Sequence, residues 1–393
     1  MGFIDTDTHV IECEETWDYL DPSERQYRPA QVEVAGLNGA PAKQFYLIGE
    51  TFCRRFPSDI RPDGFGAEYT PEVTHLTDPQ VRLRKMDAIG TDVQIVISTN
   101  FIAAEIEDAA AEAAVMRSWN RWMAERTAGC WDRLPWVLVC PTRDIDRAVK
   151  ELEFGKYNGA IGVMLKGVEH GYYLDDPRFY PLYAKAQDLD LTIVIHTGAA
   201  RHHLEGAGIA RVHQSPAANI HYPATVMKGL YAVLASDLYK RFPKLRWAFV
   251  ESGATWVPFV LHHRAHQKAT AQASSFINSG FGPTRLFPSA GDMKGEFEMR
   301  NIFVSCEADE DINYIAGIAG EGQITVATDF CHNDAGTDVM AHRVILGRAD
   351  VDKALARRVV DGNGRRAFNI PAGLRPTDRV VKPARPELEL AVL

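Results

Sequence analysis

The feature that most constrains the fold of this sequence is a regular alternation of short apolar runs with helix-forming segments. The run at residues 136–140, Trp-Val-Leu-Val-Cys, is apolar throughout, as expected of a strand that is buried on both faces. Strands of this kind, separated by helices, are typical of a parallel sheet that helices cover. The predicted strands lie near residues 3–9, 92–98, 136–140, 160–165, 191–196, 247–251, 301–305 and 324–329.

The segments between these runs predict helices with recognisable ends. Asp78 and Pro79 form a helix start, an N-cap followed by proline at the first helical position, and Gly90 marks the end of that helix. Further helices are predicted at about 104–129, 144–154, 176–189, 223–242, 256–270 and 352–366. Eight strands, mostly separated by helices, fit an α/β fold of the (β/α)₈ TIM-barrel type better than an open doubly wound sheet. No G-x-G-x-x-G follows the first strand.

Two segments fall outside the strand–helix pattern. Residues 11–78 hold many turn-forming residues, so we expect a long insertion after the first strand, either functional or used for surface packing or a subunit contact. Residues 371–393 are broken by prolines and are expected to form an extended tail that reaches a neighbouring subunit. The predicted organisation is one barrel over residues 1–370, followed by this tail.

Composition excludes several classes of partner. The formal net charge is −9 and no run of lysine or arginine occurs, which argues against nucleic acid or an anionic membrane as partner. We see no signal-peptide pattern and no apolar run of the roughly 18 residues that a membrane helix needs. The six cysteines are widely scattered, as in a reduced protein. We therefore expect a cytoplasmic protein, a homodimer or higher homo-oligomer, that acts on a small molecule.

Metal-binding residue types gather at the ends of the predicted strands. Alternation along the first strand places Asp7 and His9 on one face at its carboxyl end. His196, Glu251 and Asp329 end three later strands, and in a barrel all five side chains meet at one mouth. Histidines and carboxylates together suit Zn²⁺ or Mn²⁺ with a coordination position left open. The alternatives are a core hydrogen bond for His196 and a helix cap for Asp329.

Several short segments, in their order along the chain, resemble a known enzyme family. They lie at residues 4–9, 86–92, 195–198, 242–243 and 328–332. Together they resemble the amidohydrolase-related family of the amidohydrolase superfamily, which includes aminocarboxymuconate semialdehyde decarboxylase and γ-resorcylate decarboxylase. The resemblance implies a metal-dependent barrel that removes carboxyl groups from aromatic or enol-like acids, or that hydrolyses or hydrates related compounds.

The resemblance also implies roles for single residues. Asp7 stands where the family has a histidine or glutamate ligand, His9 and His196 match ligand histidines, and Asp329 matches an aspartate that binds metal or moves protons. The sequence departs from the family on the sixth strand, where relatives often carry a catalytic histidine. Glu251 stands there instead, as a fourth ligand, a general base or a structural carboxylate.

The remaining candidates concern substrate binding and a second metal. Arg201, His202, His203 and His221 follow the fifth strand and could bind an anionic substrate, and Glu12 and His332 are further candidate substrate contacts. Lys166 could be a carbamylated bridging lysine, but the resembled subgroup holds one metal. A plain substrate-facing or surface lysine is therefore the favoured interpretation.

Three functions compete on this evidence. In decarboxylation, Asp329 would protonate the ring carbon while the metal, Zn²⁺ or Mn²⁺, holds the departing carboxylate. In hydrolysis, a metal-activated water would attack an amide, a lactone or a C–C bond next to a carbonyl, with Asp329 or Glu251 as base. A barrel with only a structural metal is the least favoured, because the metal-binding residue types cluster at the face of the barrel where active sites lie.

Overall fold

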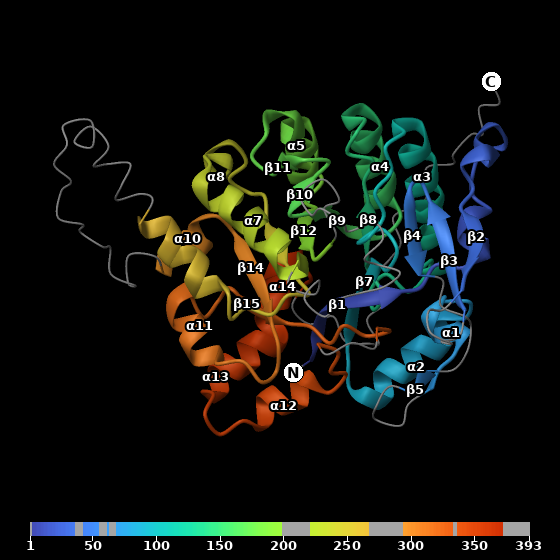
Figure 1. The fold of residues 1–393 in the computed structure, drawn as a ribbon. Helices are drawn as coiled ribbons and strands as arrows, with labels where there is room; N and C mark the ends of the chain where they lie inside the picture. The colour runs from blue at the N-terminus through green and yellow to red at the C-terminus, as the bar shows by residue number, and fades with distance from the viewer. Residues whose placement is uncertain are drawn as a thin grey trace, which may run out of the picture.

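The computed structural model describes residues 2–35, 42–54, 61–62, 68–198, 221–266, 294–332 and 336–371. Within these residues, one parallel sheet of eight strands forms the centre of the molecule and helices pack outside it (Figure 1). In their order around the sheet the strands are β1 (Ile4–Val10), β7 (Val93–Ser98), β8 (Trp136–Val139), β9 (Ala160–Lys166), β12 (Thr192–His196), β13 (Trp247–Phe249), β14 (Ile302–Cys306) and β15 (Ile324–Val326).

The sheet closes into a barrel where its first and last strands meet. The amide of His9 donates to the carbonyl of Phe330 at 2.8 Å, and the amide of Asp329 donates to the carbonyl of Asp7 at 3.1 Å. The carboxylate of Asp5 accepts from the amide and hydroxyl of Thr328, at 2.9 and 2.6 Å. These contacts confirm the predicted (β/α)₈ barrel.

The helices follow the sequence prediction with two corrections. The predicted helix at 104–129 starts later, because residues 99–108 form a loop and Asp108 caps the helix by accepting from Ala110 and Ala111. The predicted helix at 223–242 breaks at residues 236–237 into two. Outside the segment after β1, the described helices include α2 (Pro79–Ile89), α3 (Ala109–Arg126), α4 (Ile145–Tyr157), the 3-10 helix η4 (Pro177–Phe179), α5 (Tyr180–Asp188), α7 (His221–Ala235), α8 (Leu238–Arg241), α10 (Lys294–Met299), α11 (Ile312–Ala319), α12 (Ala341–Gly347), α13 (Lys353–Arg357), the π-helical η8 (Arg358–Gly362) and α14 (Asn363–Phe368). Residues 257–266 are also helical.

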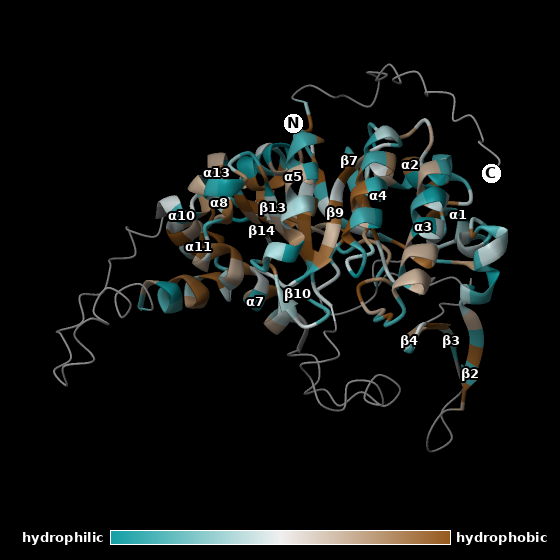
Figure 2. Cartoon of the chain, turned by 90° about the horizontal axis from the view of Figure 1, so that it is seen from above, coloured by the Kyte–Doolittle hydropathy of each residue, from teal (hydrophilic) through white to brown (hydrophobic). Residues whose placement is uncertain are grey.

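The core lies between the barrel and these helices. Trp119 and Trp122 are fully buried on α3, and Trp119 packs edge-to-face against Trp136 of β8 at 5.9 Å between ring centroids. Hydrophobic residues follow the strands, and hydrophilic residues cover much of the outer helices (Figure 2). None of the described helices has the length and apolar character to cross a membrane.

The segment after β1 contains more regular structure than its turn-rich sequence predicted. Its elements are η1 (Glu14–Trp17), η2 (Pro22–Tyr27), β2 (Ala30–Val34), β3 (Lys43–Ile48), β4 (Thr51–Arg54), β5 (Arg61–Pro62), β6 (Glu68–Tyr69) and α1 (Pro71–Thr74). Strands β2, β3 and β4 pair antiparallel and lie at the edge of the molecule far from α10 and α11 (Figures 1 and 2). Trp17 joins this segment to the barrel by packing against Tyr46 and Phe101.

A buried arginine supports the carboxyl end of β1. Arg82 on α2 has no exposed surface, and it donates to the carbonyl of His9 at 2.7 Å, to Gln94 at 2.8 Å and to the hydroxyl of Thr8 at 3.1 Å. Its guanidinium also lies 4.9 Å from the ring centroid of Phe330. A planar group with several fixed donors can make these contacts together, whereas an ammonium cannot.

We expect Arg82→Lys to destabilise the fold, because the shorter, single-point donor leaves buried acceptors on β1 and β7 without a partner. The free energy of unfolding should fall by about 2–4 kcal/mol, the cost of several unmet buried hydrogen bonds. Urea denaturation measures this. Arg84→Lys, on the exposed side of the same helix, is the matched control and should change the free energy by less than about 0.5 kcal/mol. Equal stabilities of the two variants would contradict this role of Arg82.

Candidate metal centre

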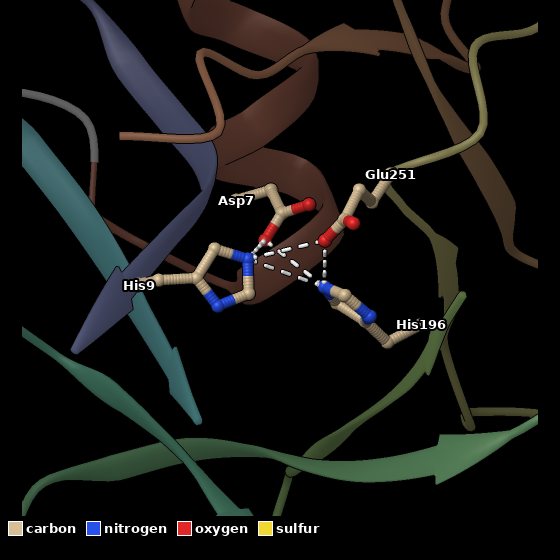
Figure 3. A group of neighbouring side chains, drawn as sticks. All are labelled: Asp7, His9, His196 and Glu251. Atoms are coloured by element: carbon tan, nitrogen blue, oxygen red, sulfur yellow. Dashed lines mark hydrogen bonds and ion pairs between the residues drawn. The ribbon is translucent and has the colours of Figure 1, made fainter. Parts of the chain in front are cut away.

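Four side chains from three strand ends converge at the mouth of the barrel (Figure 3). Asp7 and His9 come from β1, His196 ends β12, and Glu251 follows β13. One ligand atom from each of the four lies within 4.8 Å of the others. Nε2 of His196 is 2.6 Å from Oε2 of Glu251, 3.4 Å from Nε2 of His9 and 3.6 Å from Oδ1 of Asp7.

Backbone carbonyls orient both histidine rings toward the centre of this group. Nδ1 of His9 lies 3.1 Å from the carbonyl of Ser98, and Nδ1 of His196 lies 2.8 Å from the carbonyl of Thr197. A ring that donates from Nδ1 presents the lone pair of Nε2 to its neighbours, which is how metal-binding histidines are usually held. Neither carboxylate oxygen of Asp7 makes a hydrogen bond within the described residues. Buried, unsatisfied oxygens that face two imidazole nitrogens fit a divalent cation.

A second, overlapping group extends the centre toward β15. It consists of His9, Glu251, Asp329 and His332. Oδ1 of Asp329 is 3.3 Å from Nε2 of His9 and 2.7 Å from Nδ1 of His332, and the hydroxyl of Thr337 donates to Oδ2 at 2.8 Å. The ring of His332 stacks on that of His9, with centroids 3.7 Å apart and an angle of 16° between the planes.

The proton affinities of these residues reflect their burial and their mutual charges. Burial lowers the pKa of His9, but Asp7 and Glu251 outweigh that effect and raise it to about 10. Burial opposes ionisation of Glu251, yet the two imidazoles hold its pKa well below the usual range. Burial raises the pKa of Asp329 to about 6, against the lowering effect of His332. In the absence of a cation, protons on the imidazoles compensate the carboxylates, so binding of a metal ion would release them.

Two of these carboxylates sit on strained backbone at strand ends. Glu251 has φ of 51° and Asp329 has φ of 53°, in the left-handed region that side chains rarely adopt. The predicted strands 247–251 and 324–329 are therefore shorter than expected, since β13 ends at Phe249 and β15 at Val326. The backbone turns at each of these two residues, and each turn directs a carboxylate toward the centre. Backbone strain of this kind concentrates at functional sites.

Other candidates from the sequence have different surroundings. Both carboxylate oxygens of Glu12 accept hydrogen bonds, from the Ser98 hydroxyl at 2.6 Å, the Asn100 amide at 3.0 Å and the Trp119 indole at 2.8 Å. Glu12 therefore supports the loop after β7, and a contact with substrate stays a prediction. His221 begins α7, and Arg201, His202 and His203 lie outside the described residues.

Lys166 is not a surface lysine, because its side chain is buried in an ion network beside the centre. Its ammonium lies 2.6 Å from the carbonyl of Ala104 and 3.1 Å from Glu105. His170 continues the network, with Nδ1 3.7 Å from Glu105 and Nε2 2.8 Å from Glu112. Burial opposes its protonation, but Glu105 and Glu112 raise the pKa of His170 to about 9. The network joins the segments that follow β7 and β9.

Sequence reasoning missed the hydroxyl groups that orient the second group. Thr99 lies 3.1 Å from Nε2 of His332, and Thr337 contacts Asp329. Thr99 follows directly after a predicted strand, which is the one local signal that places it at the mouth. Thr337 follows no predicted element, so its contact arises only from the fold.

Comparison with known proteins places these observations in a family. A sequence model of the amidohydrolase family matches residues 74–370. Among solved structures, an amidohydrolase from Mycobacterium avium subsp. paratuberculosis K-10 superposes with a TM-score of 0.73 at 16% identity, covering 95% of this chain and 99% of that chain.

Two decarboxylases share the fold. The 5-carboxyvanillate decarboxylase of Sphingomonas paucimobilis gives a TM-score of 0.63 at 22% identity, with 94% of this chain and 99% of that chain covered. A dihydroxybenzoic acid decarboxylase from Polaromonas sp. JS666, solved with manganese and the inhibitor 2-nitroresorcinol, gives 0.58 at 17% identity, with 95% and 98% covered. The family model covers well over half of the chain, and the chain therefore belongs to the amidohydrolase family of enzymes.

Proposed function

We propose that this enzyme is a metal-dependent, non-oxidative decarboxylase of a hydroxylated aromatic or enol-like carboxylic acid. The observation that carries the proposal is the convergence of Asp7, His9 and His196 on one point, with Asp329 beside them. The similarity in fold to decarboxylases of aromatic acids supports this choice of reaction. A cytoplasmic homo-oligomer is part of the same proposal.

One divalent ion per chain is the proposed cofactor, held by Asp7, His9 and His196 together with one further carboxylate. Zn²⁺ is the first choice for a site with two imidazoles, and Mn²⁺ is the second, supported by the manganese in a similar decarboxylase. When bound, the ion would hold the carboxylate and a neighbouring hydroxyl or enol oxygen of the substrate and draw electron density from them.

The chain's own residues would move the proton. Asp329, protonated on its carboxyl group, would donate to the carbon that bears the departing carboxylate. The proton forms the new C–H bond, the C–C bond to the carboxylate breaks, its electron pair returns to the ring, and CO₂ leaves. A solvent proton then restores Asp329. His332, 2.7 Å from Asp329, is placed to pass that proton on.

Hydrolysis is the second candidate, and Glu251 is the observation that favours it. Its carboxylate stays ionised beside the two imidazoles, as the lowered pKa indicates, and an ionised carboxylate next to a metal can act as the base toward a bound water. The amidohydrolase from M. avium subsp. paratuberculosis K-10 shares the same fold. The substrate would then be an amide, a lactone or a C–C bond next to a carbonyl.

The first prediction concerns metal content. Protein purified without added metal should carry close to one equivalent of divalent ion, because two imidazoles and buried carboxylates converge on one point and a bound ion would replace the imidazole protons. His9→Ala and His196→Ala should each lose most of the metal in elemental analysis, whereas His262→Ala, at an exposed position, should keep it. Full metal content in both histidine variants would show that the ion binds elsewhere.

The second prediction concerns the reaction. With a panel of hydroxylated aromatic acids, the enzyme should release CO₂, and in D₂O the product should carry deuterium at the vacated carbon. Asp329→Asn, which cannot donate the proton, should slow turnover by about 10²–10⁴-fold, the usual size of general acid catalysis. If no acid yields CO₂ while an amide or lactone is cleaved with incorporation of ¹⁸O from solvent water, the hydrolase is the correct assignment.

A further inference from the structure

We infer that Glu12 is a positioning residue of the metal centre, which orients His9 and His332 through the turn at residues 98–101, where β7 ends. The inference rests on the metal-dependent function proposed above. Glu12 lies between β1 and η1 and is buried, and neither group of candidate ligands contains it. It acts instead through the backbone and the hydroxyl groups of the turn.

The carboxylate of Glu12 holds this turn from inside the molecule. Oε1 accepts from the Ser98 hydroxyl at 2.6 Å, and Oε2 accepts from the amide of Asn100 at 3.0 Å. The amide of Phe101 donates to the hydroxyl oxygen of Ser98 at 3.0 Å, which leaves the hydroxyl proton for Glu12. The indole of Trp119 on α3 donates to Oε1 at 2.8 Å. Glu12 therefore joins the turn to the helix outside the barrel.

The first histidine that depends on this turn is His9. Its Nδ1 lies 3.1 Å from the carbonyl of Ser98. Ser98 is thus bound to Glu12 through its side chain and to His9 through its carbonyl, so a shift of Ser98 would rotate the imidazole. Partners of this kind fix the orientation of a metal-binding histidine, and their loss costs about 10–100-fold in metal affinity or activity.

The second histidine is His332, which is oriented by the next residue of the turn. The hydroxyl of Thr99 donates to the carbonyl of Val10 at 2.9 Å, and its oxygen lies 3.1 Å from Nε2 of His332. Because the hydroxyl proton goes to Val10, the oxygen accepts, and Nε2 of His332 carries the proton between them. The Nδ1 side of the ring then faces Oδ1 of Asp329, 2.7 Å away. His332 also stacks on His9, so one turn controls both rings of this pair.

An amide of the same size cannot replace the carboxylate. Glutamine has one acceptor oxygen, whereas Glu12 accepts from different donors on each of its two oxygens. In one orientation the NH₂ group of glutamine would face the amide of Asn100, and in the other it would face the indole of Trp119. Both of these donors have fixed directions, so a buried donor would face a donor and the side chain would have to move.

Binding of Mn²⁺ alone, measured by isothermal titration on the metal-stripped full chain, tests the inference without any substrate. Glu12→Gln should raise the Kd by about 10–100-fold. The matched control is Glu151→Gln, since Glu151 is also a buried carboxylate but bonds Asn120 and Arg121. Glu151 shares no partner with the turn, so its variant should change the Kd by less than about threefold. Melting curves show that both variants are folded and compare their stabilities.

The link between Glu12 and the turn can also be cut from the other side. Ser98→Ala removes the hydroxyl and keeps the carbonyl, and it should raise the Kd for Mn²⁺ in the same range as Glu12→Gln. This variant decides the question if Glu12→Gln does not fold. An unchanged Kd in the folded variants, or an equal loss of affinity in Glu151→Gln, would overturn the inference.

A second measurement depends on neither metal nor activity. In crystals of the metal-stripped protein, the distance from Nδ1 of His9 to the carbonyl of Ser98 should stay near 3.1 Å in wild type. In Glu12→Gln it should exceed about 3.5 Å, beyond hydrogen-bond range. The same distance in both proteins would contradict the role of Glu12. If wild type binds no Mn²⁺, the proposed function fails, whereas these distances still decide whether Glu12 positions His9.

Discussion

The barrel closes through the backbone of the same residues whose side chains form the metal centre. The amides of His9 and Asp329 make two backbone hydrogen bonds between β1 and the segment after β15, and their acceptors are the carbonyls of Phe330 and Asp7. Residues more than three hundred positions apart in the sequence are thereby fixed within hydrogen-bond reach. Arg82 holds the carbonyl of His9 from the other side. The geometry of the centre therefore depends on closure of the whole barrel, and any slip in register between these segments would separate its ligands.

Two clusters of carboxylates and histidines lie at this mouth, and their charges are balanced differently. In the network of Glu105, Glu112 and His170, the side chain of Lys166 makes an ion pair with Glu105. Among the described residues, no lysine or arginine makes an ion pair with the carboxylates of the metal centre. The first cluster contains a lysine among its own side chains, whereas the second does not. Residue types alone do not distinguish these cases, but the position of a lysine does.

The barrel could be predicted from the sequence because its strands and helices alternate regularly along the chain. Strands such as β8 and β12 are buried on both faces, so each is recognisable from its own residues without knowing which strands lie beside it. The strand ends were less predictable. Glu251 and Asp329 looked like the last residues of strands, whereas the chain turns into the left-handed region there, a conformation that depends on contacts such as those of Glu310.

Carboxylates were equally ambiguous from sequence alone. Glu12, on the segment after β1, was predicted to contact substrate, and the structure shows that it accepts hydrogen bonds from Ser98, Asn100 and Trp119. His332, the other candidate substrate contact, lies against the centre, with Nδ1 2.7 Å from Oδ1 of Asp329. The two side chains differ in the number of hydrogen-bond donors that the fold places around them. That number is set by the loop after β7 and by α3, which are distant in sequence from both residues.

The left-handed backbone at Glu251 and Asp329 also limits how this centre could change over evolutionary time. At such positions glycine, asparagine and aspartate are tolerated, whereas valine, isoleucine and threonine are strongly disfavoured by their branched side chains. Replacement of Asp329 by asparagine or glycine would keep the left-handed backbone conformation and remove only the carboxylate. An exchange for a branched residue adds about 1–3 kcal/mol of strain to the closure of the barrel. New activities on this scaffold would therefore arise more readily through substitutions in the surrounding loops than through new residue types at these two strand ends.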